Sequence, residues 1–215
     1  MPTAREALLD AALSALCARP WSAVRMVDVA SAAGVSRQTL YNEFGSKEGL
    51  ARALVRREAD VYLRGVDRVL AERAFPADRL VALAEWTVRS ARTSALIRAL
   101  LTGCWGERLP APRAQRTLGA HSSVPAQRRA DAGVPGPSEL VATVRDRSLA
   151  ALEKELPAVE PGELARCCET VVRLALSYVM APDPGPPGAP GAPGGGGHAA
   201  HVRAVLARTP VRPVP

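Results

Sequence analysis

Cysteines, lysines and long apolar runs are scarce in this chain of 215 residues. Its four cysteines, Cys17, Cys104, Cys167 and Cys168, show no CxxC or other zinc-ligand spacing. We therefore predict no metal site and interpret them as small core or boundary residues in a reducing cytosol. No apolar run approaches the roughly 18 residues that suggest a membrane span, and no cationic leader opens the chain. We expect a soluble, cytoplasmic protein without membrane contact.

The common signatures of catalysis are also missing. The sequence contains no Ser/His/Asp set, no cluster of metal ligands and no phosphate-binding glycine loop before a helix. His198 and His201 have a spacing that a metal site could use, but neither a carboxylate nor a thiol stands near them in the sequence. We therefore expect that the protein is not an enzyme, has no catalytic residues and uses no cofactor.

Positive charge comes almost entirely from arginine, because the only lysines are Lys47 and Lys154. The formal net charge is +7 and the pI is about 9.9, which suits a polyanionic partner such as nucleic acid. The basic residues are spread along the chain, however. The geometry of a few side chains, and not the bulk charge, must therefore define a DNA site.

Residues 26–50 have the pattern of two short helices joined by a tight turn. We predict a helix over about 26–33, a turn at 33–36 and a second helix over 37–44. Gly34 supplies the positive φ that such a turn usually needs, and Ser36 can cap the second helix. The apolar positions fall on the facing sides of the two helices: Val29, Ala30, Ala33, Val35, Leu40 and Phe44.

The second helix keeps hydrogen-bond donors on its outer side. This donor-rich face, the glycine turn and the capped start are together typical of a helix-turn-helix that reads DNA. A helix over residues 4–18, with apolar residues on one face, completes a three-helix head. The outward donors are Arg37, Gln38, Thr39, Tyr41 and Asn42.

The rest of the chain is predicted to be helical, which makes the fold class all-α. Residues 106–137 show no sustained period and are expected to be mobile, with short helices around 112–117 or 126–132 left open. Residues 183–197 are rich in proline and glycine and predict a linker, followed by a short helix around 200–208. The longer helices are expected at about 46–73, 77–92, 95–102, 138–156 and 161–179.

The last two of these helices carry more apolar surface than a lone surface helix needs. A second pair of helices, supplied by a twofold partner, would cover this surface in a four-helix interface. The alternative is that the surface packs on the chain's own body. The predicted interface residues are Leu140, Val144, Leu152, Leu164, Val171, Val172, Ala175 and Val179.

The head resembles the tetracycline-repressor-like (TetR) transcriptional regulators, most densely over Ala4 to Leu54. The resemblance implies an all-helical body that binds small molecules and dimerises through its last two long helices. It also implies three parts: a helix-turn-helix domain at 1–50, an effector-binding and dimerisation domain at 51–182, and a flexible linker and tail at 183–215. The segments that carry it are Leu9-Asp10-Ala11-Ala12, Asp28-Val29-Ala30, Ala33-Gly34-Val35-Ser36, Thr39-Leu40-Tyr41, Phe44 and Ser46-Lys47-Glu48.

Residues 36–47 are also similar to actinobacterial members of this family tied to alkane or fatty-acid metabolism. The chain departs from the family pattern at several positions. Arg25 replaces a threonine that often touches phosphate, Gln38 replaces a frequent glycine, and Glu43 replaces a frequent histidine. Gln38 therefore adds a side chain that can read a base, whereas Glu43 shows that not every position on this helix must favour DNA binding.

The predicted roles divide into base reading and phosphate contact. Arg37, Gln38 and Asn42 are expected to read bases. The donors assigned to phosphates are Arg25, Ser36, Thr39, Tyr41 and Lys47.

From these residues we expect a DNA-binding regulator, a repressor that a small lipophilic effector releases from a palindromic operator. The alternatives are an effector-insensitive or a sequence-indifferent DNA-binding protein. The expected partners are double-stranded DNA, a second copy of the chain and a small apolar effector. The residues predicted to line the effector pocket are Leu83, Trp86, Leu100, Cys104, Trp105 and Val144.

Overall fold

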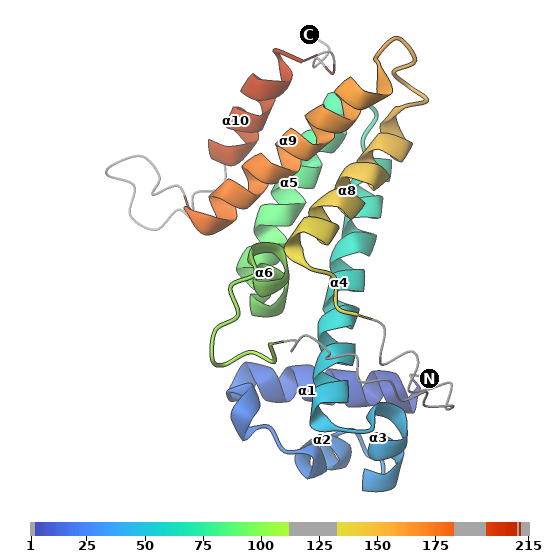
Figure 1. Ribbon diagram of the computed structural model, residues 1–215, viewed down its shortest axis with the longest axis vertical. Helices are drawn as coiled ribbons and strands as arrows, with labels where there is room; N and C mark the ends of the chain where they lie inside the picture. The colour runs from blue at the N-terminus through green and yellow to red at the C-terminus, as the bar shows by residue number, and fades with distance from the viewer. Residues whose placement is uncertain (1–2, 112–132, 183–196, 210, 212–215) are drawn as a thin grey trace, which may run out of the picture. The chain divides into compact units, whose positions relative to one another are not determined.

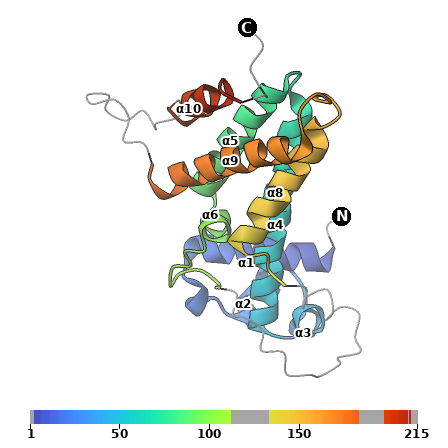
Figure 2. The ribbon, with the colours of Figure 1, turned by 45° about the horizontal axis from the view of Figure 1, so that its top comes forward.

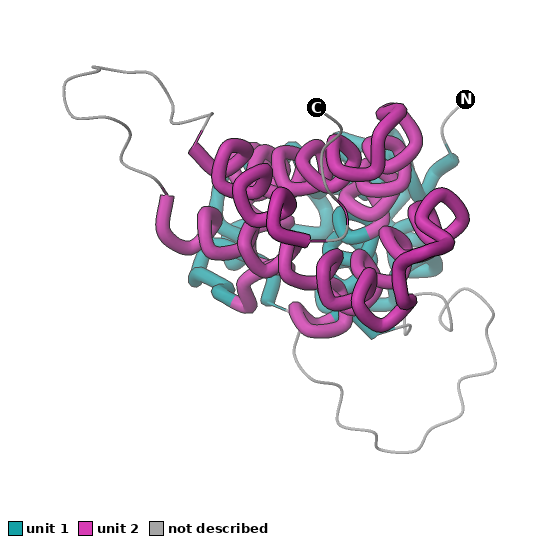
Figure 3. Tube along the Cα trace, turned by 90° about the horizontal axis from the view of Figure 1, so that it is seen from above, with its two compact units in different colours: residues 1–59, 104–135 teal, residues 60–103, 136–215 magenta. Residues whose placement is uncertain are grey.

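The computed structural model describes residues 3–111, 133–182, 197–209 and 211, and these are helical or lie in turns and loops, without a strand among them. The chain divides into two compact units (Figure 3). Unit 1 comprises residues 1–59 and 104–135, and unit 2 comprises residues 60–103 and 136–215. The all-α prediction is confirmed. The loop and helices expected within 112–132 and the linker expected at 183–196 lie outside the described residues.

Unit 1 contains a three-helix head, as predicted (Figure 1). Its helices are α1 (Ala4–Ala18), α2 (Met26–Ala32) and α3 (Arg37–Phe44), with a single 3-10 turn, η1 (Trp21–Ala23), between the first two. Thr3 and Glu6 form a capping box that fixes the start of α1, with the Thr3 N–H donating to the Glu6 carboxylate at 2.8 Å. The buried core of the head includes Leu8, Ala12, Val29, Leu40, Phe44, Leu50 and Leu54.

Two segments that are distant in the sequence join this head. The Trp21 N–H donates to the carbonyl oxygen of Arg108 at 2.9 Å, and the Arg56 guanidinium donates to the carbonyl oxygen of Gly133 at 2.8 Å. Pro110, in the first of these segments, is buried. Unit 1 is therefore a helix-turn-helix head extended by the chain around residues 104–111.

Unit 2 is built around α5 (Pro76–Thr93), whose inner face is almost wholly buried. It packs against α6 (Ala95–Thr102), α9 (Pro161–Met180) and α10 (Gly197–Leu206), while α8 (Pro137–Leu152) packs against α6 and α9 (Figures 1 and 2). Helix α4 (Lys47–Glu72) begins in unit 1, and its residues from Asp60 onward belong to unit 2. None of the helices in the described ranges is long and apolar enough to cross a membrane.

Helix α8 begins and ends differently from the prediction. We expected Ser138 to cap it, but the helix starts at Pro137, because the Glu139 carboxylate accepts the Gly136 N–H at 2.7 Å. It ends at Leu152, before the predicted limit at 156. Arg79 binds both the Ala151 carbonyl and the Glu155 carboxylate at this point, so it satisfies a carbonyl that the end of a helix leaves free.

The residues predicted to form a dimer interface are buried inside the single protomer. Each of the eight is at most 5% exposed. They lie on α8 and α9, which pack against each other and against α5, α6 and α10 of the same chain. Helix α10 covers this surface with Ala199, Val202 and Leu206, all of them buried. The chain itself thus covers the excess apolar surface that α8 and α9 carry: Leu140, Val144, Leu152, Leu164, Val171, Val172, Ala175 and Val179.

A glycine determines how α4 and α5 approach each other in unit 2. A Cβ atom at Gly65 would lie 2.0 Å from the Trp86 ring, so the indole lies directly on the glycine backbone. The Trp86 Nε1–H donates to the Tyr62 carbonyl oxygen at 3.1 Å. Arg68 and Arg89 stack on the ring at 5.1 and 5.9 Å from its centroid.

Replacing Gly65 should therefore destabilise unit 2. A glycine-to-alanine change in a helix usually stabilises by about 0.5–1 kcal/mol, but here the added methyl group displaces the indole. We expect Gly65→Ala to lower the free energy of unfolding by about 1–3 kcal/mol in urea denaturation. Gly106→Ala, where the structure leaves open space, is the control. A Gly65→Ala protein as stable as the original would contradict this packing.

Candidate nucleic-acid interface

The turn between α2 and α3 depends on Gly34, which has a φ of +67°. The Gly34 N–H donates to the Ser31 carbonyl at 3.1 Å, and the Val35 N–H donates to the Ala30 carbonyl at 3.0 Å. A residue with a Cβ would be strained at this φ. The glycine thus lets the chain leave α2 and enter α3 within a few residues, as the sequence predicted.

Ser36 caps α3 in the predicted way. Its Oγ accepts the Thr39 N–H at 3.0 Å and lies 2.9 Å from the Thr39 hydroxyl. This bond satisfies one of the free N–H groups in the first turn of the helix. Because the two hydroxyls share one hydrogen bond, one of them keeps a proton that it can donate outward.

Helix α3 has one buried and one exposed face. Leu40 and Phe44 are 0% and 3% exposed and hold the helix to the head. On the opposite face Arg37, Gln38, Tyr41 and Asn42 are exposed, and Thr39 is half-buried. The structure therefore brings all the predicted base-reading residues together on one helix.

Two of these residues, Gln38 and Asn42, form a hydrogen bond with each other. The Gln38 Nε2–H donates to the Asn42 Oδ1 at 2.8 Å, one helical turn apart. The structure shows no hydrogen bond or ion pair for Arg37 within the described residues. Arg37 and the Gln38–Asn42 pair thus present guanidinium and amide groups, the side-chain groups that recognise base edges.

Arg25, predicted to touch phosphate, is held at the start of α2 by Asp28. Its Nε and Nη2 donate to the two Asp28 carboxylate oxygens at 3.0 Å each, and Arg19 lies 3.4 Å from the same carboxylate. The hydrogen bonds from Arg25 hold the pKa of Asp28 below its usual value. Sequence reasoning missed that Asp28 orients this cation.

Lys47, also predicted to touch phosphate, is fixed at the first residue of α4. Its Nζ donates to the Ser22 carbonyl at 3.1 Å and lies 5.6 Å from the centre of the Trp21 ring. The ammonium group keeps further N–H donors for a ligand. Ser22 and Trp21, both in η1, are positioning residues that the sequence did not reveal, since 25 residues separate Ser22 from Lys47.

Glu43, the acidic residue on α3, forms an ion pair with Arg5 of α1. The Arg5 Nη1 lies 3.4 Å from both the Glu43 carboxylate and the Glu43 carbonyl. The Arg5 guanidinium also stacks on the Phe44 ring at 4.7 Å. This pair removes the repulsion that an unpaired carboxylate would exert on DNA.

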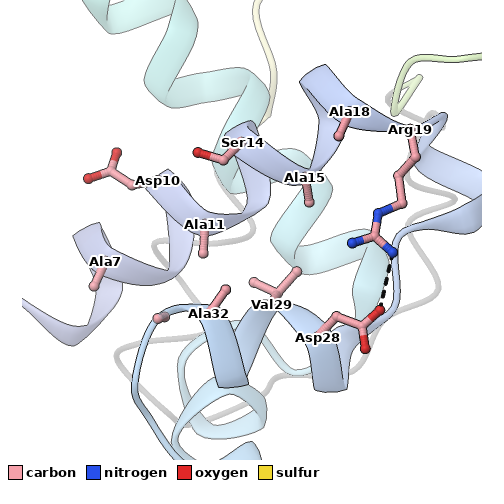
Figure 4. A pocket seen from close by; sticks show the side chains of 11 residues that line it. Ala7, Asp10, Ala11, Ser14, Ala15, Ala18, Arg19, Asp28, Val29 and Ala32 are labelled. Carbon is pink, nitrogen blue, oxygen red and sulfur yellow. Dashed lines mark hydrogen bonds and ion pairs between the residues drawn. The ribbon is translucent and has the colours of Figure 1, made fainter.

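A separate groove of about 480 Å³ lies between α1 and α2 (Figure 4). Six alanines form most of its wall, and the Arg19–Asp28 ion pair stands at one end. It contains none of the residues predicted for the effector pocket. Those are Leu83, Leu100 and Val144, buried in unit 2; Trp86, half-buried there; and Cys104 and Trp105, which belong to unit 1.

Cys167 and Cys168 are buried, as predicted for core residues, whereas Cys17 and Cys104, for which we expected core or boundary positions, are exposed. His201 is hydrogen-bonded to the Tyr178 hydroxyl at 2.8 Å, and burial lowers the pKa of His198. Burial raises the pKa of Cys168 to about 12. Within the parts that the structure describes, no three His, Cys, Asp or Glu side chains gather as a metal site would require.

Comparison with known proteins confirms the resemblance of the head. Residues 8–54 match the model of bacterial regulatory proteins of the tetR family. The chain is 54% identical over 65 residues to the HTH-type transcriptional regulator AlkX of Mycobacterium tuberculosis, covering 30% of this chain and 29% of AlkX. An uncharacterized HTH-type regulator of the same species is 35% identical over 99 residues, covering 46% and 49%. The chain thus spans half or less of these relatives' length.

Solved structures show the same fold over nearly the whole chain. The TetR family repressor AlkX from Dietzia sp., implicated in biodegradation of n-alkanes, superposes with a TM-score of 0.50 at 21% identity, covering 94% of this chain and 92% of that chain. AibR in complex with isovaleryl coenzyme A and operator DNA gives 0.51 at 16% identity, covering 97% and 99%. A TetR/AcrR regulator from Thermobifida fusca gives 0.55 at 18%, covering 95% and 96%.

Proposed function

We propose that this chain is a TetR-type transcriptional regulator that binds a near-palindromic operator as a homodimer and represses transcription until a small lipophilic effector releases it. The exposed face of α3 carries the proposal, because it offers Arg37, Gln38 and Asn42 on a helix whose other face is buried. Residues 1–50 would serve as the DNA-binding domain, 51–182 as the effector-binding and dimerisation domain, and 183–215 as linker and tail.

Base reading and phosphate contact are divided among different side chains in this proposal. Arg37 bonds guanine O6 and N7, while the amides on α3 read adenine. Ser36, Thr39, Tyr41, Lys47 and Arg25 contact phosphates, which set the register of the head without reading sequence. The bonds that hold Arg25 to Asp28 and Lys47 to Ser22 support this division, because they place both cations next to the ends of α2 and α3.

The division predicts two kinds of loss of affinity. Gln38→Ala should relax the base preference at one operator position, at a cost of roughly 1–3 kcal/mol for the preferred base. Lys47→Ala should weaken all duplexes by the same factor and make the affinity less salt-dependent. Fluorescence anisotropy on a panel of single-base operator variants separates the two. Equal losses across the panel for both variants would contradict the assignment.

For the dimer, we propose that the outer face of α8 and α9 binds the second copy. The inner residues of both helices are covered within the protomer. On the outer side, Arg145 of α8 is paired with Glu169 of α9 at 3.4 Å, and Glu169 is paired with Arg173 at 2.6 Å. A twofold axis through this face would give the dimer the same symmetry as a palindromic operator, whose half-sites are about 34–36 Å apart.

A bulky charge on this face should break the dimer. Thr170 is exposed on α9 beside Glu169. In an isologous interface the change would occur twice, so we expect Thr170→Arg to sediment as a monomer and to lose at least about tenfold in operator affinity. Arg64→Glu, a charge change on the exposed side of α4, should remain dimeric. A dimeric Thr170→Arg protein would exclude this face as the interface.

A lipophilic effector is proposed because the core of unit 2 is aliphatic, with Leu83, Leu100 and Val144 buried in it. AibR, a protein of the same fold, has been crystallised with an acyl-coenzyme A and operator DNA. A ligand releases the operator only if it favours a conformation that binds DNA poorly. The narrower link to alkane or fatty-acid metabolism is supported by the 54% identity over 65 residues to a regulator named AlkX, and by the fold shared with the Dietzia AlkX repressor, which is implicated in biodegradation of n-alkanes.

Effector binding should raise the thermal stability of the chain. A ligand present at 100 times its Kd stabilises the folded state by about 2.7 kcal/mol, which corresponds to several degrees for a chain of this length. We expect at least one member of a series of fatty acids and alkanols of increasing length to raise Tm and weaken operator binding. Short polar acids are the control. A series in which no member shifts Tm would contradict an apolar pocket.

A further inference from the structure

The two side-chain amides of α3 form a hydrogen bond with each other in the absence of DNA. Gln38 and Asn42 are both exposed, and the Gln38 Nε2–H donates to Asn42 Oδ1 at 2.8 Å. Residues four apart on a helix are neighbours on its surface, which makes this bond geometrically easy. It restricts the rotation of the Gln38 amide before any base is met.

The bond changes which hydrogen-bonding groups Gln38 can offer. A free glutamine amide has two N–H donors and one acceptor oxygen. With one N–H given to Asn42, Gln38 keeps one donor and one acceptor, side by side on a planar group. The Asn42 Oδ1 uses one of its acceptor sites for this bond, while the two N–H donors of Asn42 remain available.

This remaining pattern matches one base. In the major groove, adenine presents an acceptor at N7 and a donor at N6, whereas guanine presents acceptors at both N7 and O6. One donor beside one acceptor complements adenine. Against guanine, the Gln38 oxygen would face O6, and two acceptors repel each other.

We infer that Gln38 and Asn42 form a single reading unit, in which Gln38 contacts adenine and Asn42 is a positioning residue that holds the Gln38 amide in the adenine-reading orientation. This inference rests on the proposed function of α3. It goes beyond that function by assigning one base to the pair and by removing Asn42 as an independent reader of a second base.

A double-mutant cycle on the full-length protein tests the unit. The operator is first selected from random duplexes, and affinities are then measured at fixed salt with A, G, C or T at the position that Gln38→Ala relaxes. The original protein should prefer A over G there by on the order of 5- to 100-fold. Asn42→Ala should reduce that ratio by at least about twofold. In a Gln38→Ala background, Asn42→Ala should leave the ratio unchanged.

A conservative variant separates positioning from a structural role. Asn42→Asp keeps the oxygen that accepts the Gln38 N–H, so the A/G ratio should survive, although the added negative charge weakens binding to every duplex alike. Duplexes with 7-deazaadenine or purine at this position remove N7 or the N6 amino group in turn. Each should weaken binding of the original protein and leave that of Gln38→Ala unchanged.

Several outcomes would overturn the inference. Asn42→Ala could keep the full A/G ratio, or it could relax a different operator position from Gln38→Ala, in which case Asn42 acts on its own. A preference for guanine at the Gln38 position would show the opposite amide orientation. All of these require an original protein that selects an operator, whereas a protein that selects no duplex would contradict the proposed function itself.

Discussion

The burial of Leu40 and Phe44 beneath α3 is the interaction on which the rest of the head depends. A helix of eight residues is too short to be stable in water by itself, so packing and capping must supply its stability. Both side chains are at most 3% exposed, and Ser36 satisfies an N–H of the first turn. These contacts also fix the positions of the exposed polar side chains on the other face of α3. The head is therefore a rigid support for a few polar groups.

Charge around this support is arranged in pairs. Glu43 of α3 is paired with Arg5, and Asp28 of α2 is paired with Arg25 and Arg19, so these two carboxylates are each matched by a cation. These pairs are exposed or half-exposed and add little stability. Their effect is on the local field and on side-chain orientation. A head with a small surplus of positive charge can bind a polyanion if its carboxylates are neutralised locally.

The sequence predicted the head well because its determinants are local. The turn at Gly34, the cap at Ser36 and the limits of α3 all follow from residues within a few positions. It could not predict the Arg5–Glu43 pair, whose members are 38 residues apart.

The sequence also could not tell which surface covers the apolar face of α9. Periodicity shows that a face is buried, but not whether α10 of the same chain or another molecule buries it. The start of α8 was missed because Ser138 has the features of a helix cap, whereas the Glu139 carboxylate accepts the Gly136 N–H in the structure.

The scarcity of lysine gives Lys47 a practical value. Lys47 and Lys154 are the only two side-chain amines in the protein, and the former is anchored to Ser22 in unit 1 while the latter is exposed in unit 2. An amine-acylating reagent followed by peptide mass mapping thus has one reporter in the head and one internal standard in the body. The composition of the chain makes chemical footprinting of this protein a measurement with single-residue resolution.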